Sequence, residues 1–235
     1  MKTIAIILAG GSGQRLGNPT PKQFLYLGGK QVIEHSIEIF NNHPLVDEIT
    51  IVSNLLYMND VEALCLKNNY SKVKKILAGG KERYESSLSA IQSYSEDCFL
   101  LIHDSVRPLV SSRIITECIQ ALKQYNAVNV GADVSDTIIQ INDKNEIKNI
   151  PTRNELRFGQ SPQAFKLSTI NKAYEIGLKD ENFNATDDCG VVLKYLPEEP
   201  IYVVKGDQYN MKITFDVDLI TLENLLNCNK SRDSK

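Results

Sequence analysis

The chain has 235 residues, 42% of them apolar, and is therefore long enough to bury the core of an α/β domain. Its formal net charge of −3 argues against non-specific binding of nucleic acid, and the apolar stretch at its N-terminus is too short to span a membrane. The 5 cysteines have no C-x-x-C spacing, which predicts reduced thiols in a cytoplasmic protein rather than a disulfide framework or a zinc site.

The first predicted element is an unbroken apolar run, residues 4–9, which leads directly into a glycine-rich turn at residues 10–13. Such a run is typical of a strand buried on both faces. The glycines let the backbone bend sharply and bring amide groups close to a bound anion. Arg15 and Lys22 add two positive charges nearby. We expect a phosphate-binding loop at the end of this strand.

Two commoner phosphate-binding patterns do not fit this turn. A P-loop has Lys and then Ser or Thr after its last glycine, but Gly17 is followed by Asn18 and Pro19. The dinucleotide pattern G-x-G-x-x-G would need glycine at position 16, which is Leu16. The spacing therefore argues against P-loop ATPases and dehydrogenases. A strand-to-loop turn without a ligand is the remaining alternative, and the two nearby cations disfavour it.

Beyond the turn, predicted strands and helices alternate along the chain. Strands are expected over residues 47–52, 73–78, 98–102, 127–134 and 201–204. Helices are expected over residues 32–40, 60–67, 86–93, 111–125, 167–178 and 216–226, and from a cap at residues 186–188 to residue 195. This alternation predicts an α/β fold in which residues 1–235 form a single domain. Its sheet should be Rossmann-like, mostly parallel and flanked by helices, with a polar tail at residues 227–235.

Ligands of such sheets bind beyond the carboxyl ends of the strands. Three predicted strands end in segments suited to binding: the glycine turn at 10–13, the pair Gly79–Gly80, and the pair His103–Asp104. Because these ends lie at one edge of the sheet, we expect the three segments to converge there.

Residues 137–157 break the alternation. Two β-prone segments, 137–141 and 147–150, flank a turn-forming cluster at 142–145, which predicts a protruding β-hairpin arm. A small hairpin is marginally stable alone. We expect it to pack on a second copy of the chain. The alternative is a hairpin folded onto its own domain.

Six segments in register resemble the polyol-phosphate cytidylyltransferases, the enzymes specific for 2-C-methyl-D-erythritol 4-phosphate or ribitol 5-phosphate. They are Leu8–Gly17 with Pro21–Phe24, Gly79–Arg83 with Ser86, His103–Pro108, Asp136–Thr137, Gly159–Gln163 and Asn210–Thr214. The resemblance implies an enzyme that transfers CMP from CTP to a polyol phosphate and releases pyrophosphate.

The residues suit that chemistry. The acceptor's own phosphate would be the nucleophile, and with a second pKa near 6 it is mostly dianionic at neutral pH, so no general base is required. The reaction needs positive charge at the α-phosphate and in-line positioning. Arg15, Lys22 and Lys212 are the expected catalytic cations. Mg²⁺ is expected on the triphosphate, held mostly by the nucleotide, with Asp104 as a candidate ligand.

The family motifs also imply a nucleotide pocket, made by Leu8, Ala9, Gly10, Gly11, Gly80, Lys81, Arg83, Ser86 and Asp104. Asp104 directly follows an apolar strand, so it is expected at the ligand edge, where it would accept hydrogen bonds from the hydroxyl groups of a sugar or of the polyol substrate. A helix cap or a pair with Arg107 is the alternative for Asp104. The alternative for Arg83 is a surface salt bridge to Glu82 or Glu85.

In the family the arm crosses to the other subunit of a homodimer. The resemblance therefore implies that Thr137, Arg153 and Ser161 bind the polyol phosphate in the partner's site, with Ser105 and Arg107 as further substrate contacts. The guanidinium of Arg153 suits bidentate phosphate binding. The alternative is that Arg153 is a solvated surface arginine. The residues at 186–187 are expected only to cap a helix.

Two departures favour the ribitol branch. Erythritol-type enzymes usually have two alanines where this chain has Ser105 and Val106, and they tend to show an aspartate before, and a tryptophan soon after, the position of Arg153. The ribitol branch implies cell-wall or capsule polysaccharide synthesis, and the erythritol alternative implies isoprenoid synthesis. A guanylyltransferase, a non-catalytic nucleotide-binding module and an oxidoreductase are less well supported.

Overall fold

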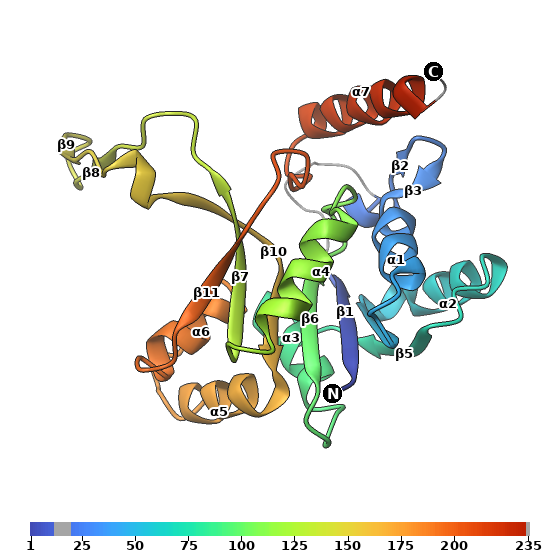
Figure 1. Cartoon of the computed structure of the whole chain (residues 1–235), viewed down its shortest axis with the longest axis horizontal. Coiled ribbons are helices and arrows are strands. Elements are labelled where there is room, and N and C mark those ends of the chain that lie inside the picture. The colour runs from blue at the N-terminus through green and yellow to red at the C-terminus, as the bar shows by residue number, and fades with distance from the viewer. Residues whose placement is uncertain (12–19, 234–235) are drawn as a thin grey trace.

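The computed structural model describes residues 1–11 and 20–233, with side chains up to Asn227. Its core is a seven-stranded sheet in the order β11-β7-β10-β6-β1-β4-β5. The strands are β1 (Thr3–Ala9), β4 (Glu48–Ser53), β5 (Val73–Ala78), β6 (Phe99–Asp104), β7 (Ala127–Asp133), β10 (Arg157–Lys166) and β11 (Ile201–Lys205). All neighbouring strands are parallel except β10, which runs antiparallel to β6 and β7. The mostly parallel sheet is confirmed (Figure 1).

Helices cover both faces of the sheet. They are α1 (Val32–Asn42), α2 (Met58–Lys67), α3 (Arg83–Ile91), α4 (Ser112–Ala121), α5 (Leu167–Gly177) and α6 (Asp188–Tyr195). The last helix, α7 (Asp216–Asp233), packs instead on Leu27, Val32 and Ile213. On one face of β1, Ala5 and Ile7 pack with residues of α1, α2 and α4. On the other face, Ile4 and Ile6 pack with residues of α3, α5 and α6. Every residue of β1 is buried, as its apolar run predicted.

Smaller elements complete the chain. A hairpin of β2 (Tyr26–Leu27) and β3 (Lys30–Gln31) follows the short 3₁₀ helix η2 (Lys22–Phe24), and η3 (Leu55–Tyr57) precedes α2. The arm consists of β8 (Gln140–Ile141), β9 (Ile147–Asn149) and η4 (Arg153–Glu155), and it projects away from the sheet at the left of Figure 1. The predicted antiparallel hairpin is therefore present.

The structure differs from the sequence expectations at β10. Residues 157–166 form a strand that the sequence did not reveal, because a polar stretch with a proline lacks the apolar alternation of a strand. Gln160, Ser161 and Gln163 are nevertheless buried, and each forms hydrogen bonds within the protein.

Several helix bounds also differ from those expected. Helix α3 begins at Arg83 rather than at residue 86, because Glu82 and Glu85 form a capping box ahead of it. Helix α7 continues to Asp233, through most of the segment expected to be a polar tail.

Candidate active site

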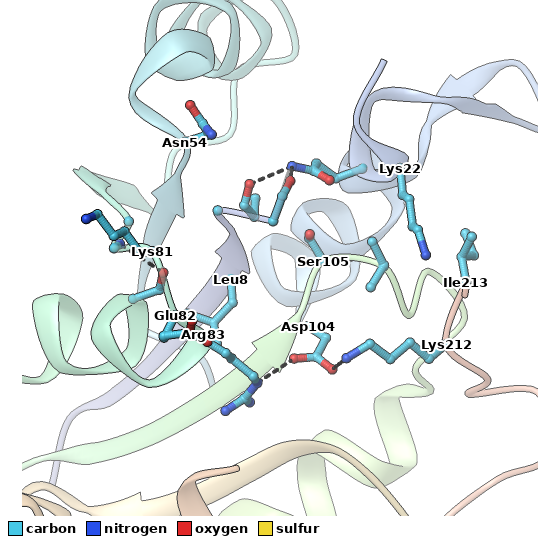
Figure 2. Close-up of a pocket in the computed structure, with 18 of the residues that line it drawn as sticks. Leu8, Lys22, Asn54, Lys81, Glu82, Arg83, Asp104, Ser105, Lys212 and Ile213 are labelled. Atoms are coloured by element: carbon cyan, nitrogen blue, oxygen red, sulfur yellow. Dashed lines mark hydrogen bonds and ion pairs between the residues drawn. The ribbon is translucent and has the colours of Figure 1, made fainter. Parts of the chain in front are cut away.

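The carboxyl ends of the central strands open into a cavity of about 1160 Å³. Gly10 and Gly11 after β1, Gly79 and Gly80 after β5, and Asp104 at the end of β6 all line it, so the predicted convergence of three segments is present (Figure 2). Residues 212–214 close the cavity from the far end of the chain. His103 is fully buried behind the cavity wall.

All nine residues expected around a nucleotide line this cavity: Leu8, Ala9, Gly10, Gly11, Gly80, Lys81, Arg83, Ser86 and Asp104. Their backbones approach closely. The Gly80 amide donates to Ser86 Oγ at 3.2 Å, and a Cβ added to Gly79 would lie 2.8 Å from the same oxygen. No side chain fits at Gly79 without displacing the serine, because real Cβ contacts are longer than this.

Two lysines that lie far apart in sequence both line the cavity. Lys22 Nζ donates to the Thr214 carbonyl at 2.6 Å, and Lys212 Nζ contacts Asp104 Oδ2 at 2.8 Å. Gln23, for which the sequence predicted no role, donates to the carbonyls of Ala9 and Gly11 and so ties η2 to the glycine turn. Arg15 lies outside the described residues.

Asp104 is the centre of a cationic cluster. Arg83 Nε approaches its Oδ1 at 3.3 Å, and Arg107 Nε lies 3.7 Å from its Oδ2, where Lys212 also binds. Burial alone would raise the pKa of this carboxyl, but the charges of Arg83, Lys212 and Arg107 outweigh it and hold the pKa well below its ordinary value. Asp104 is therefore an anion, and Figure 2 shows Arg83 and Lys212 reaching it from opposite sides.

Behind the cavity, a hydrogen-bond chain fixes the backbone of Asp104. Burial lowers the pKa of His103 to about 4, so its imidazole is neutral at pH 7. The His103 Nε2–H donates to the Arg107 carbonyl at 3.1 Å, which leaves Nδ1 to accept from the Ser161 hydroxyl at 3.0 Å. Ser161 Oγ in turn accepts from the Asp104 amide at 3.0 Å. Ser161 thus holds Asp104 in place.

Residues 3–228 match the family described as IspD, 2-C-methyl-D-erythritol 4-phosphate cytidylyltransferase. The chain belongs to this family. The IspD family uses CTP for nucleotidyl transfer, so the predicted resemblance and enzyme class are confirmed.

Two relatives differ in the acceptor that their names state. A bifunctional ribulose 5-phosphate reductase/CDP-ribitol pyrophosphorylase of Haemophilus influenzae is 47% identical over 95% of this chain, which spans only 48% of that protein's length. A 2-C-methyl-D-erythritol 4-phosphate cytidylyltransferase of Thermobifida fusca is 42% identical over 96% of this chain and 93% of its own.

The fold agrees with the solved IspD structures. A 4-diphosphocytidyl-2C-methyl-D-erythritol synthase of Anaerococcus prevotii superposes with a TM-score of 0.84 and 28% identity, covering 96% of this chain and 98% of its own. No helix in the described part of this chain is long and apolar enough to cross a membrane.

The residues that the IspD resemblance assigned to the acceptor are not gathered in one place. Ser105 lines the cavity, whereas Thr137 and Arg153 lie on the arm, where Arg153 Nη2 donates to Thr137 Oγ1 at 3.1 Å. Arg107 is turned inward, donating to the carbonyls of Asn210 and Gly159. The buried Ser161 hydroxyl is engaged with His103 and Asp104, and these contacts weigh against its predicted binding of the acceptor phosphate.

The contacts of Arg83 exclude its alternative interpretation. It pairs with Asp104 and, at 2.7 Å, with Asp188, rather than with the neighbouring Glu82 or Glu85. Asp188 was expected only to help cap α6. The expected cap is present at Asp187, whose Oδ1 accepts from the Gly190 amide, whereas the Asp188 carboxylate pairs with Arg83, a contact that sequence spacing could not reveal.

The described residues contain no cluster of three or more His, Cys, Asp or Glu side chains that could hold a metal ion. Asp104 offers one carboxylate, but three cationic side chains already surround it. This donor set does not suit a dedicated protein site for Mg²⁺, which prefers several oxygen ligands.

Proposed function

We propose that this protein transfers CMP from CTP to D-ribitol 5-phosphate, forming CDP-ribitol and pyrophosphate. The observation that carries the proposal is that Lys22 and Lys212 line one cavity together with the glycines that follow β1. The greater identity to the relative named for CDP-ribitol, 47% against 42%, supports ribitol 5-phosphate as the acceptor. The alternative acceptor is 2-C-methyl-D-erythritol 4-phosphate, which the family description names.

In this proposal the acceptor phosphate attacks the α-phosphate of CTP, and the bond from the α-phosphorus to the pyrophosphate oxygen breaks. The acceptor dianion needs no base to remove a proton. Lys22 and Lys212 stabilise the charge that develops on the α-phosphate. The family motif assigns the same role to Arg15. A single preorganised charge of this kind is typically worth about 10²–10³ in kcat.

The glycine segments would receive the nucleotide. The close approach of Gly10, Gly79 and Gly80 to Ser86 leaves backbone groups, rather than side chains, at this wall of the cavity. Successive backbone amides can form a concave surface that binds phosphate groups. We propose that the cytidine lies against residues 8–11 and 80–86.

A divalent cation, Mg²⁺ or a similar ion, would accompany CTP. Because the cations around Asp104 disfavour a metal there, we propose that the triphosphate itself supplies most of the metal ligands. Bound in this way, the ion would neutralise phosphate charge, and no protein carboxylate would be committed to it.

We also propose that the protein works as a homodimer. The arm exposes several large apolar side chains, which a monomer would leave in water: Ile138, Ile139, Ile141, Ile147 and Ile150. An arm seated on a partner would bury them and could bring Arg153 and Thr137 to the partner's cavity.

The described cysteines are buried free thiols, which fits a reducing cytoplasm.

The test is turnover with both acceptors. Purified protein, CTP and Mg²⁺ are mixed with ribitol 5-phosphate or 2-C-methyl-D-erythritol 4-phosphate, and pyrophosphate release is measured. We expect a higher kcat/KM with ribitol 5-phosphate, and no turnover when GTP replaces CTP. A clear preference for the erythritol compound would overturn the proposed acceptor, and no release with either would overturn the proposed reaction.

A further inference from the structure

Arg83 lies between two carboxylates, one at the cavity and one in the core. Its Nε donates to Asp104 Oδ1 at 3.3 Å, and its Nη1 donates to Asp188 Oδ2 at 2.7 Å. Asp104 lines the cavity, whereas Asp188 is 0% exposed and does not line it. The guanidinium therefore connects the reacting side of the protein to a fixed point in its interior.

Asp188 is held rigidly. Tyr174 OH donates to its Oδ1 at 2.7 Å, and Ser87 Oγ donates to its Oδ2 at 3.2 Å. Its backbone amide donates to Gln163 Oε1 at 3.0 Å, independently of its carboxylate. With every partner supplied by the protein and no access to the cavity, Asp188 cannot contact a substrate.

The pairing requires both the charge of Asp188 and the shape of arginine. A guanidinium presents several N–H groups in one rigid plane, so binding two carboxylates through different nitrogens fixes the orientation of that plane. A buried charge without its partner is unfavourable. Loss of the negative charge at Asp188 would therefore release Arg83 to move, while Asp104 remained its one described carboxylate partner.

We propose that Asp188 is a positioning residue, which holds the Arg83 guanidinium so that its Nε faces Asp104. Arg83 in turn fixes the orientation of the Asp104 carboxylate, which binds Lys212. The proposal rests on the proposed function, because its effect on turnover passes through the cavity in which CTP would react. It predicts that Asp188 influences turnover only through Arg83.

A double-mutant cycle tests this coupling. Asp188→Asn keeps the side-chain shape and an acceptor for Tyr174 but removes the charge that Arg83 requires. We expect kcat/KM for CTP to fall about 10- to 100-fold, the usual scale for one hydrogen bond to a charged group. In an Arg83→Gln background, Asp188→Asn should change kcat/KM by less than about twofold. Equal losses in both backgrounds, or no loss in either, would overturn the proposal.

Two further variants separate positioning from stability. Asp187→Ala removes the neighbouring cap, so it should lower Tm while leaving kcat/KM close to that of the wild type. If Asp188→Asn does not fold, Tyr174→Phe weakens the hold on the same carboxylate and keeps its charge. We expect Tyr174→Phe to lower kcat/KM about threefold, and the Arg83→Gln background should abolish that loss. A loss that persists there would overturn the proposal.

A readout without turnover distinguishes failure of this inference from failure of the proposed function. The Nε–H signal of Arg83 in a ¹H–¹⁵N spectrum, assigned by its absence in Arg83→Gln, should be sharp and slow to exchange in the wild type. Asp188→Asn should broaden or remove it. An unchanged signal would overturn the positioning role even if the wild type released no pyrophosphate with either acceptor.

Discussion

Lowering the pH should destabilise the protein through His103. Burial lowers the pKa of this side chain to about 4, whereas in the unfolded chain it is near 6.5. Between these values the unfolded state binds a proton that the folded state does not, so the free energy of unfolding falls as the pH falls. A difference of about 2.5 pKa units corresponds to a loss of roughly 3 kcal/mol across the window.

The assay is urea denaturation at several values between pH 7 and about pH 4.5, with wild type and His103→Asn compared. The variant should be less stable at pH 7, because it loses the bonds of the imidazole to Ser161 and Arg107. Since asparagine does not titrate, the curve of the variant should be flatter. His43, whose pKa burial also lowers, contributes to both curves and cancels in their difference. Parallel curves for the two proteins would refute the assignment of a buried neutral imidazole.

Three further predictions concern the cavity and the arm. Lys22→Ala should lower kcat at least about a hundredfold without loss of the fold. The surface control Lys30→Ala should leave kcat unchanged, and a near-normal rate in Lys22→Ala would exclude the catalytic role assigned to Lys22. Gly79→Ala should raise KM for CTP, because its Cβ would lie 2.8 Å from Ser86 Oγ; an unchanged KM would contradict the close packing of this wall. Arg153→Ala and Lys22→Ala chains, each nearly inactive alone, should regain activity when mixed dimers form, and mixed dimers without activity would refute the shared site.

The sequence predicted well those elements whose own residues and flanking turn residues show the pattern of a strand or helix. Strand β5 has the predicted bounds, residues 73–78, because turn-forming residues before it and two glycines after it leave a segment too short for a helix. β10 escaped detection because its buried polar residues depend on partners from distant elements, such as the Asp207 carbonyl that accepts from Gln160. Tertiary contacts override local propensity at such positions.

In the candidate site, too, local patterns could be predicted from the sequence, whereas contacts between distant residues could not. Glycines and cations at strand ends predicted where the cavity lies. The pairing of Arg83 with Asp188 joins residues that are 105 positions apart, and no spacing rule relates them. The position of Ser161 was equally hidden, since only the structure shows its hydroxyl between His103 and the Asp104 amide.

The most direct test of the proposed reaction follows the oxygen atoms. Ribitol 5-phosphate labelled with ¹⁸O in its phosphate is incubated with CTP, Mg²⁺ and the protein, and the products are examined by ³¹P NMR. If the acceptor phosphate attacks the α-phosphate, the label appears in the bridge of CDP-ribitol and is absent from the released pyrophosphate. Label in the pyrophosphate, or no CDP-ribitol under conditions that bind CTP, would contradict the proposed reaction.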